Sequence, residues 1–260
     1  MKKLIVLLLG VAILAIGISA FAGISSTKHN LTTAGFFTTK TTAAIFSNPT
    51  NASDTTVITV CSFCHIPHGA NITIAGAPLW SRGTPNTAGY SVYGSGSAGG
   101  TSGLTLGGTP VGIPGAQSLT CLSCHDGTIS VGAIYKNTVL LTAPMTGDVN
   151  ANGMLVKPSG NTSYNADFTQ DLRNDHPIGL VYDFGYPTPQ NTAGLSTTIS
   201  VSGPPFYVTV GGNNVFPIYG GTIGVGTLEC ASCHDPHTTA QPDFLRDAPT
   251  TICQDCHVNK

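Results

Sequence analysis

The alternation of apolar and polar residues is clearest in one part of the chain, residues 186–228. Residues 198–202 and 206–210 alternate, and a Gly-Gly-Asn-Asn run at 211–214 precedes the apolar residues 215–218. Alternation of this kind is typical of half-buried strands, and a glycine-rich break is typical of a turn. The pattern predicts a pair of short hairpin strands.

Elsewhere the hydrophobic pattern predicts little regular structure. No long apolar repeat with a period of 3.6 residues is found, and residues 82–118 are dominated by Gly, Thr, Ser and Pro. Such a composition is typical of irregular loop. We expect few helices, mostly of one or two turns.

The first 22 residues have the pattern of a secretory signal peptide. Two lysines precede an apolar run at residues 4–18, and Ser-Ala-Phe-Ala at 19–22 fits a small-x-small cleavage site. A retained membrane anchor is the alternative, since residues 4–22 are at the lower edge of spanning length. We expect cleavage after Ala22, a secreted protein without a membrane anchor, and a single domain at residues 23–260.

Charge is scarce and slightly negative. Asp, Glu, Lys and Arg make up 8% of the chain, and the net charge is −2. Removal of residues 1–22 makes the charge more negative, because that segment contains Lys2 and Lys3 but no acid. This balance argues against nucleic acid as a partner, and a weakly charged surface favours self-association.

The chemistry is concentrated in a string that occurs four times, Cys-x-x-Cys-His. Chance placement of the cysteines and histidines would give roughly 0.01 such strings, and this string is the attachment site of c-type haem. The two thiols form thioethers with one haem, and the histidine ligates its iron. The predicted haem-binding cysteines are Cys61, Cys64, Cys121, Cys124, Cys230, Cys233, Cys253 and Cys256. The predicted proximal iron ligands are His65, His125, His234 and His257. Four covalently bound haem c groups are therefore expected.

The number of remaining histidines matches the number of irons. The chain has eight histidines, and those outside the motifs are His29, His68, His176 and His237. Bis-histidine ligation of all four haems would use every one of them. Met145 and Met154 are the alternative ligands, but neither lies near a motif. Because no iron then keeps an open position for substrate, we expect an electron carrier or conduit rather than an enzyme, with no catalytic residue.

His68 and His237 each follow a proximal histidine by three residues, in Cys-His-Ile-Pro-His and Cys-His-Asp-Pro-His. The proline makes the connection tight, so such a histidine does not easily reach the far face of its own haem. We expect each to ligate a haem attached at another motif. The expected fold class is a mostly irregular multihaem cytochrome c with a haem-stack core, few short helices and short β-hairpins.

A wider set of motifs resembles one family. Lys28-His-Asn-Leu31, Cys-His-Ile-Pro-His-Gly69, Ala77-Pro-Leu-Trp80, Cys-His-Asp-Gly127, Asp175-His-Pro-Ile-Gly179, Cys-His-Asp-Pro-His237 and the final Cys253-Gln-Asp-Cys-His257 occur in this order. Together they resemble the tetrahaem extracellular cytochromes that polymerise into filaments, the OmcE-type cytochrome nanowires. The glycine- and threonine-rich stretches between the motifs do not match.

The resemblance implies a head-to-tail homopolymer outside the cell with an unbroken chain of haems. It also implies that one distal histidine comes from the neighbouring subunit, a role that falls to His29 on an N-terminal arm at residues 23–60. The residues fit equally well an arm that folds back onto its own chain. A soluble periplasmic tetrahaem shuttle and a multihaem reductase are the competing interpretations.

Overall fold

The computed structural model describes residues 24, 27, 29–31, 44–48, 51–58, 60–77, 79–94, 102–104, 110–133, 149–156, 166–183, 199–200, 205–222 and 225–257. The expected signal peptide, Met145 and half of the expected N-terminal arm lie outside these residues. Among the described residues, no helix combines the length and apolar character needed to cross a membrane.

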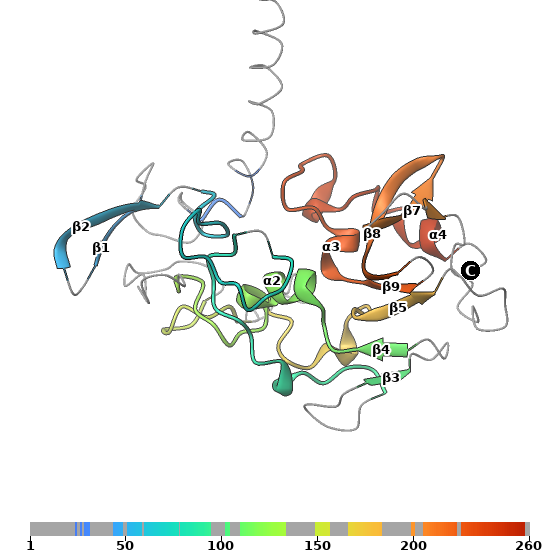
Figure 1. The fold of residues 1–260 in the computed structure, drawn as a ribbon, viewed down its shortest axis with the longest axis horizontal. Coiled ribbons are helices and arrows are strands. Elements are labelled where there is room, and N and C mark those ends of the chain that lie inside the picture. Colours follow the sequence, from blue (N-terminus) through green and yellow to red (C-terminus); the bar gives the residue numbers. More distant parts are fainter. Residues whose placement is uncertain are drawn as a thin grey trace, which may run out of the picture.

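Most of the regular structure is one antiparallel sheet of seven strands in the order β3-β4-β5-β9-β8-β7-β6. Its strands are β3 (Ser102–Leu104), β4 (Pro110–Gly112), β5 (Leu180–Asp183), β6 (Ile199–Ser200), β7 (Phe206–Val210), β8 (Asn213–Thr222) and β9 (Val225–Leu228). A separate hairpin of β1 (Ala44–Asn48) and β2 (Asn51–Ile58) projects from the body of the molecule (Figure 1).

The hairpin expected from the alternation is present as β7 and β8. Val210 pairs with Asn213, so Gly211 and Gly212 form a two-residue turn. Both have positive φ, of 56° and 84°. Two-residue hairpin turns of this kind need positive φ at both positions, which glycine adopts without steric cost.

Helices are few and are placed on the Cys-x-x-Cys-His motifs. The α-helices whose full extent is described are α2 (Ala116–His125), α3 (Cys230–Cys233) and α4 (Ile252–Cys256). Single 3₁₀ turns lie at Thr87–Gly89, Leu172–Asn174 and Pro242–Phe244. The helix α2 has nearly three turns, which is longer than expected, and it begins inside the segment expected to be loop.

The sheet has an apolar core of its own, which the sequence pattern did not predict. Phe206, Val208, Phe216 and Ile218 of β7 and β8 are at most 3% exposed. They belong to a larger buried cluster that also contains Tyr90, Val92, Val111, Leu122, Leu172, Leu180, Tyr182 and Leu228. Alternate residues of a strand share a face, so modest alternation was sufficient to build this side of the sheet.

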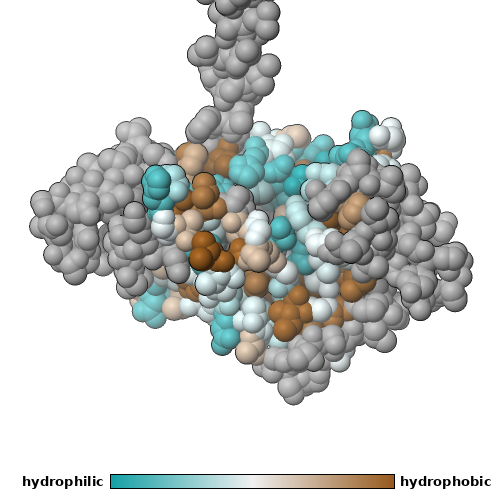
Figure 2. All heavy atoms as spheres, viewed as in Figure 1, coloured by the Kyte–Doolittle hydropathy of each residue, from teal (hydrophilic) through white to brown (hydrophobic). Residues whose placement is uncertain are grey.

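A second, smaller core lies beside the first two motifs and consists of Leu31, Phe63, Val131 and Leu155. The outer surface is mixed, and hydrophobic residues are interspersed with hydrophilic ones on the face shown in Figure 2. Ile72, Leu79 and Ile113 are the large hydrophobic side chains that are exposed among the described residues.

The sheet register aligns the segments that lead to three of the candidate ligands. Val111 of β4 pairs with Leu180 of β5, and Leu180 pairs with Leu228 of β9. The chain enters α2 soon after β4 and α3 directly after β9, while His176 lies just before β5. Three strands in one register therefore position the second motif, the third motif and one distal candidate.

Candidate functional site

Each Cys-x-x-Cys-His motif folds as a single helical turn. The amide N–H of the motif histidine donates to the carbonyl of the first cysteine at 2.8 Å for His65, 3.0 Å for His234 and 2.8 Å for His257, and the motif of His125 lies inside α2. Residues at i, i+3 and i+4 share one face of a helix. This turn therefore presents both thiols and the imidazole on one side, as attachment of one flat ring requires.

All eight cysteines are described, and none forms a disulfide. Burial raises the pKa of the Cys64 thiol to about 12 and that of Cys256 to about 12. A hydrogen bond between the thiols of Cys121 and Cys230 raises the pKa of Cys121 and places the second and third motifs side by side. Seven of the thiols are half-buried and Cys253 is exposed, so each remains accessible to a group that it would bind.

Helices α2 and α3 are also joined by a buried carboxylate. Glu229, 2% exposed, caps α3, and its Oε2 accepts from the amide of Gly115 at 3.0 Å and from the Ser118 hydroxyl. Ser118 Oγ in turn accepts from the amide of Cys230 at 2.9 Å. The starts of the second and third motifs are thus fixed to one another by three hydrogen bonds.

Three proximal histidines each have a spare histidine near them. The ring centroids are 6.1 Å apart for His125 and His29, 6.2 Å for His65 and His237, and 6.4 Å for His257 and His176. A metal-bound imidazole nitrogen lies about 2 Å from the metal, and the ring centre lies about 1 Å further away, so two imidazoles on opposite sides of one iron have centroids about 6 Å apart. The three spacings fit one iron between each pair.

The fourth proximal histidine and the fourth spare histidine are not among these pairs. The described ring contacts between histidines do not include His234 or His68. His68 is exposed in the turn that follows the first motif. The structure therefore brings a spare histidine beside three of the four proximal histidines, and the described ring contacts assign no such neighbour to His234.

Hydrogen bonds at Nδ1 leave Nε2 as the metal-binding nitrogen in four of the histidines. His125 Nδ1 lies 2.6 Å from the Ala166 carbonyl, and His234 Nδ1 lies 2.7 Å from the Asp243 carbonyl. His176 Nδ1 lies 3.1 Å from the Pro177 carbonyl. Since a carbonyl oxygen only accepts, Nδ1 must carry the proton in each case. Metal-ligating histidines typically make this kind of bond.

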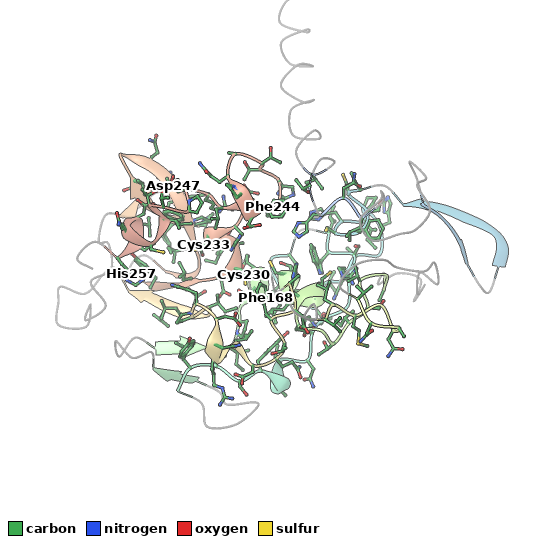
Figure 3. The ribbon with its side chains drawn as sticks, turned by 180° about the vertical axis from the view of Figure 1, so that it is seen from behind. Phe168, Cys230, Cys233, Phe244, Asp247 and His257 are labelled. Carbon is green, nitrogen blue, oxygen red and sulfur yellow. The ribbon has the colours of Figure 1, made fainter. Side chains whose placement is uncertain are left out.

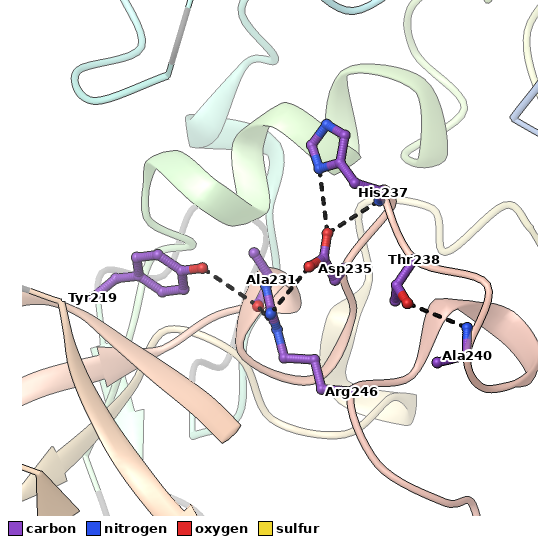
Figure 4. A network of polar contacts seen from close by, with 7 residues as sticks. All are labelled: Tyr219, Ala231, Asp235, His237, Thr238, Ala240 and Arg246. Carbon is purple, nitrogen blue, oxygen red and sulfur yellow. Dashed lines mark hydrogen bonds and ion pairs between the residues drawn. The ribbon is translucent and has the colours of Figure 1, made fainter. Parts of the chain in front are cut away.

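His237 is held by a carboxylate instead (Figure 4). Asp235 Oδ1 accepts from the amide of His237 at 3.0 Å and lies 3.2 Å from its Nδ1. Asp235 Oδ2 accepts from Arg246 Nη1 at 3.3 Å, while Arg246 Nε donates to the Ala231 carbonyl. Arg246 thus pairs with a carboxylate of its own chain.

Three of the histidines, which are half-buried or exposed at the surface, favour their neutral, ligating form. Burial, with a smaller contribution from His125, lowers the pKa of His29 to about 4. Burial also lowers the pKa of His125 and of His176. An imidazole must be unprotonated at one nitrogen to bind a metal, so these side chains are ready to bind at neutral pH.

Aromatic rings orient several of these imidazoles, a role that the sequence analysis did not give to phenylalanine. The Phe244 ring is stacked on His29 with centroids 4.5 Å apart, and the Phe168 ring lies 5.6 Å from that of His125. Figure 3 labels both rings, together with Cys230 and Cys233 of the third motif. Nothing in the local sequence marks these two rings, because the contacts join distant segments.

The first and third motifs share a structural repeat. In the first, the amide of Ile66 donates to Leu79, and the amide of Ser81 donates to Cys64. In the third, the amide of Asp235 donates to Phe244, and the amide of Arg246 donates to Cys233. Leu79 and Phe244 both have positive φ, of 53° and 62°. In both the first and the third motif, a later segment therefore pairs with the motif through the same two backbone hydrogen bonds. We call these the return segments, residues 79–81 and 244–246.

Of the methionine alternatives, only Met154 is described. Its amide donates to Asn150 Oδ1 at 3.2 Å, within a turn at residues 149–155.

A comparison with protein families matches residues 224–260 to the family described as the doubled CXXCH motif. No curated protein matches the chain. The match covers the third and fourth motifs. It indicates covalent haem binding and electron transfer in a multihaem c-type cytochrome, which agrees with the donor set of the site.

Proposed function

We propose that this chain is an electron-transfer protein that holds four haem c groups, each ligated by two histidines. The observation that carries the proposal is the set of three imidazole pairs at 6.1–6.4 Å. Each pair joins a motif histidine to a histidine outside the motifs. Haem iron with two strong protein ligands exchanges single electrons without binding substrate.

The ligand pairs follow from these spacings. His65 pairs with His237, His125 with His29, and His257 with His176, which leaves His68 for His234. The first and third motifs would then exchange distal ligands. His237 follows the third motif and faces His65 of the first, and His68, which follows the first motif, would ligate the iron at His234 of the third. The return segments, the Nδ1 hydrogen bonds and the buried carboxylate of Glu229 hold these residues in place while charge moves.

Substitution of single distal histidines tests the proposal. In His29→Ala, His176→Ala and His237→Ala, one haem of four should become high-spin and bind carbon monoxide when reduced, while mass spectrometry still finds four haems. The matched control is Met154→Leu, which should leave all haems low-spin. Wild-type protein that binds carbon monoxide at most of its haems would contradict bis-histidine ligation and favour the multihaem reductase.

We further propose that the chain is the subunit of an extracellular conductive filament. The ordered motifs and the weakly charged surface support this proposal. Head-to-tail contacts that do not close into a ring generate open filaments. In the filament, His29 of one subunit would ligate the haem at Cys121 and Cys124 of the next.

A specific observation favours the alternative, a soluble periplasmic shuttle. In the single chain, His29 lies opposite His125 of the same chain and is stacked on Phe244. One chain would then supply its own ligand to the second haem. The filament requires the same pair to form between copies.

Negative-stain imaging of purified wild-type protein and of His29→Ala separates these functions. The filament proposal expects wild-type filaments that His29→Ala abolishes, with three bis-histidine haems remaining. Filaments that persist in His29→Ala would refute the role of His29. Wild-type protein that is a monomer with four low-spin haems would support the shuttle.

A further inference from the structure

Arg82 is a fully buried cation that forms no ion pair with any carboxylate in the described part of the chain. It is 0% exposed, its Nη1 donates to the Val131 carbonyl at 2.7 Å, and its Nη2 donates to the Ser130 carbonyl at 2.5 Å. Its Nε has no hydrogen-bond partner. The ion pairs of the described residues involve other groups, so no described carboxylate pairs with Arg82. A buried unpaired charge costs several kcal/mol, which indicates an anion that the described polypeptide does not supply.

Trp80, two residues earlier, has a second unpartnered donor. Its side chain is 9% exposed, and its indole Nε1 is buried without a partner. Ser81, between them, donates its hydroxyl to the Phe63 carbonyl at 2.6 Å. In an extended segment, residues two apart point to one side and the residue between them points to the other. Two unused N–H donors of one segment are thus available to the same acceptor.

This segment lies along the first motif. Trp80 forms a β-bridge with His65, and the two rings are 5.8 Å apart at 78°. The amide of Ser81 donates to the Cys64 carbonyl at 2.9 Å. The guanidinium of Arg82 is close enough to lower the pKa of the Cys64 thiol, although burial, the larger effect, raises it overall. The Arg82 guanidinium also contributes to the lowered pKa of His125 in the second motif, where burial is the larger cause. The backbone pairing and the ring contact of this segment are with the first motif, so an anion bound by both Trp80 and Arg82 would lie beside that motif.

We propose that Trp80 and Arg82 bind a propionate of the haem attached at Cys61 and Cys64. The proposal rests on attachment of that haem. A carboxylate accepts hydrogen bonds from both donors, and those from a guanidinium are charge-assisted and strong. Reduction removes one positive charge from the iron, so a nearby fixed cation favours the reduced state. Arg82 therefore also raises the reduction potential of this haem relative to a site without the cation.

A map of the haem-loaded protein at side-chain resolution tests the binding directly. The expected result is a carboxylate oxygen of the first-motif haem about 2.7–2.9 Å from a guanidinium nitrogen of Arg82. A carboxylate from another haem, or water alone in that position, would overturn the proposal.

Redox titration followed by absorbance tests the effect on potential. In Arg82→Gln, one of four haems should become about tenfold harder to reduce, a shift of about 59 mV for a one-electron couple. Trp80→Phe should shift the same haem in the same direction by less. Arg173→Gln, the same change at an exposed arginine, is the control and should shift none. Four-haem Arg82→Gln protein with wild-type potentials would refute the role.

Haem counting separates this proposal from the proposed function. If mass spectrometry finds no haem on the first motif of the wild type, the proposed function fails at that motif. If Arg82→Gln does not fold, Trp80→Phe and the wild-type map still decide. A wild-type map with four haems and no carboxylate at Arg82 overturns only the present inference.

Discussion

The buried carboxylate of one residue, Glu229, joins the second motif to the third. Glu229 caps α3 while its side chain accepts hydrogen bonds from residues at the start of α2. Its burial raises its pKa above the usual 4.5, despite the hydrogen bonds that oppose this shift. The carboxylate thus costs free energy when it ionises in the folded protein.

Glu229→Gln tests this cost. A raised folded pKa means that the unfolded state loses its proton first, so stability falls as pH rises from 4.5 toward the folded pKa. Glutamine keeps an acceptor oxygen and does not ionise. Its stability relative to wild type should therefore increase between pH 4 and pH 7, by about 1 kcal/mol. Glu229→Ala, which leaves the Gly115 amide and the Ser118 hydroxyl without their acceptor, should lose about 2–3 kcal/mol at pH 4 and about 1 kcal/mol less at pH 7, because alanine does not ionise either.

Denaturant unfolding of the haem-loaded proteins at pH 4 and pH 7 measures these differences. A Glu229→Gln variant whose stability relative to wild type is the same at both pH values would show that burial of this carboxylate carries no ionisation cost.

Asp235 accepts a hydrogen bond from the candidate ligand His237 and so affects the basicity of its imidazole. Its hydrogen bond with His237, together with Arg246, lowers its pKa to about 2, so it is ionised at neutral pH. A carboxylate that accepts from a ligating imidazole increases the basicity of that ligand, and a more basic ligand stabilises the oxidised iron.

In Asp235→Asn we expect a higher reduction potential for the haem at His65, with four haems still attached. Redox titration measures the shift, and Asp171→Asn is the control. An unchanged titration curve for Asp235→Asn would contradict ligation by His237.

At the scale of elements, β4 and the residue just before β5 make a close backbone contact that helps to position the motifs. The amide of Gly112 donates to the Gly179 carbonyl at 2.8 Å, and the amide of Gly179 donates to the Leu228 carbonyl at 2.9 Å. Gly179 has a φ of 67°, and a Cβ atom there would lie 2.7 Å from the Gly112 carbonyl oxygen. Both its conformation and its surroundings therefore require glycine.

Gly179→Ala should destabilise the protein more than Gly212→Ala does. Gly212, in the β7–β8 turn, also has positive φ, of 84°, but a Cβ there meets nothing within 4 Å. Gly212→Ala should cost about 1–2 kcal/mol from the backbone alone, and Gly179→Ala should cost at least 2 kcal/mol more because β4 must move. Denaturant unfolding gives both values. Since His176 lies three residues before Gly179, we also expect a high-spin fraction in Gly179→Ala only. Equal stability losses would show that the strand contact is not constrained.

At the scale of the whole molecule, the sequence predicts those features of the structure that depend on a few neighbouring residues. The helical turn of each motif and the hairpin turn at Gly211 and Gly212 are both contained in a few adjacent residues. The partners of the histidines are not, because His237 reaches the first motif and His29 reaches the second across the fold. The core around Phe206 and Phe216, the stacking of Phe244 on His29 and the burial of Arg82 likewise depend on contacts between distant segments, so a single sequence does not reveal them.

Near-infrared magnetic circular dichroism of the purified, oxidised protein tests the central claim most directly, because its charge-transfer band identifies the two axial ligands of each low-spin haem. The account predicts a single class of band, that of two histidine ligands, with an intensity equal to four haems per chain. A high-spin signal, a band from methionine ligation, or an intensity below four haems would contradict it.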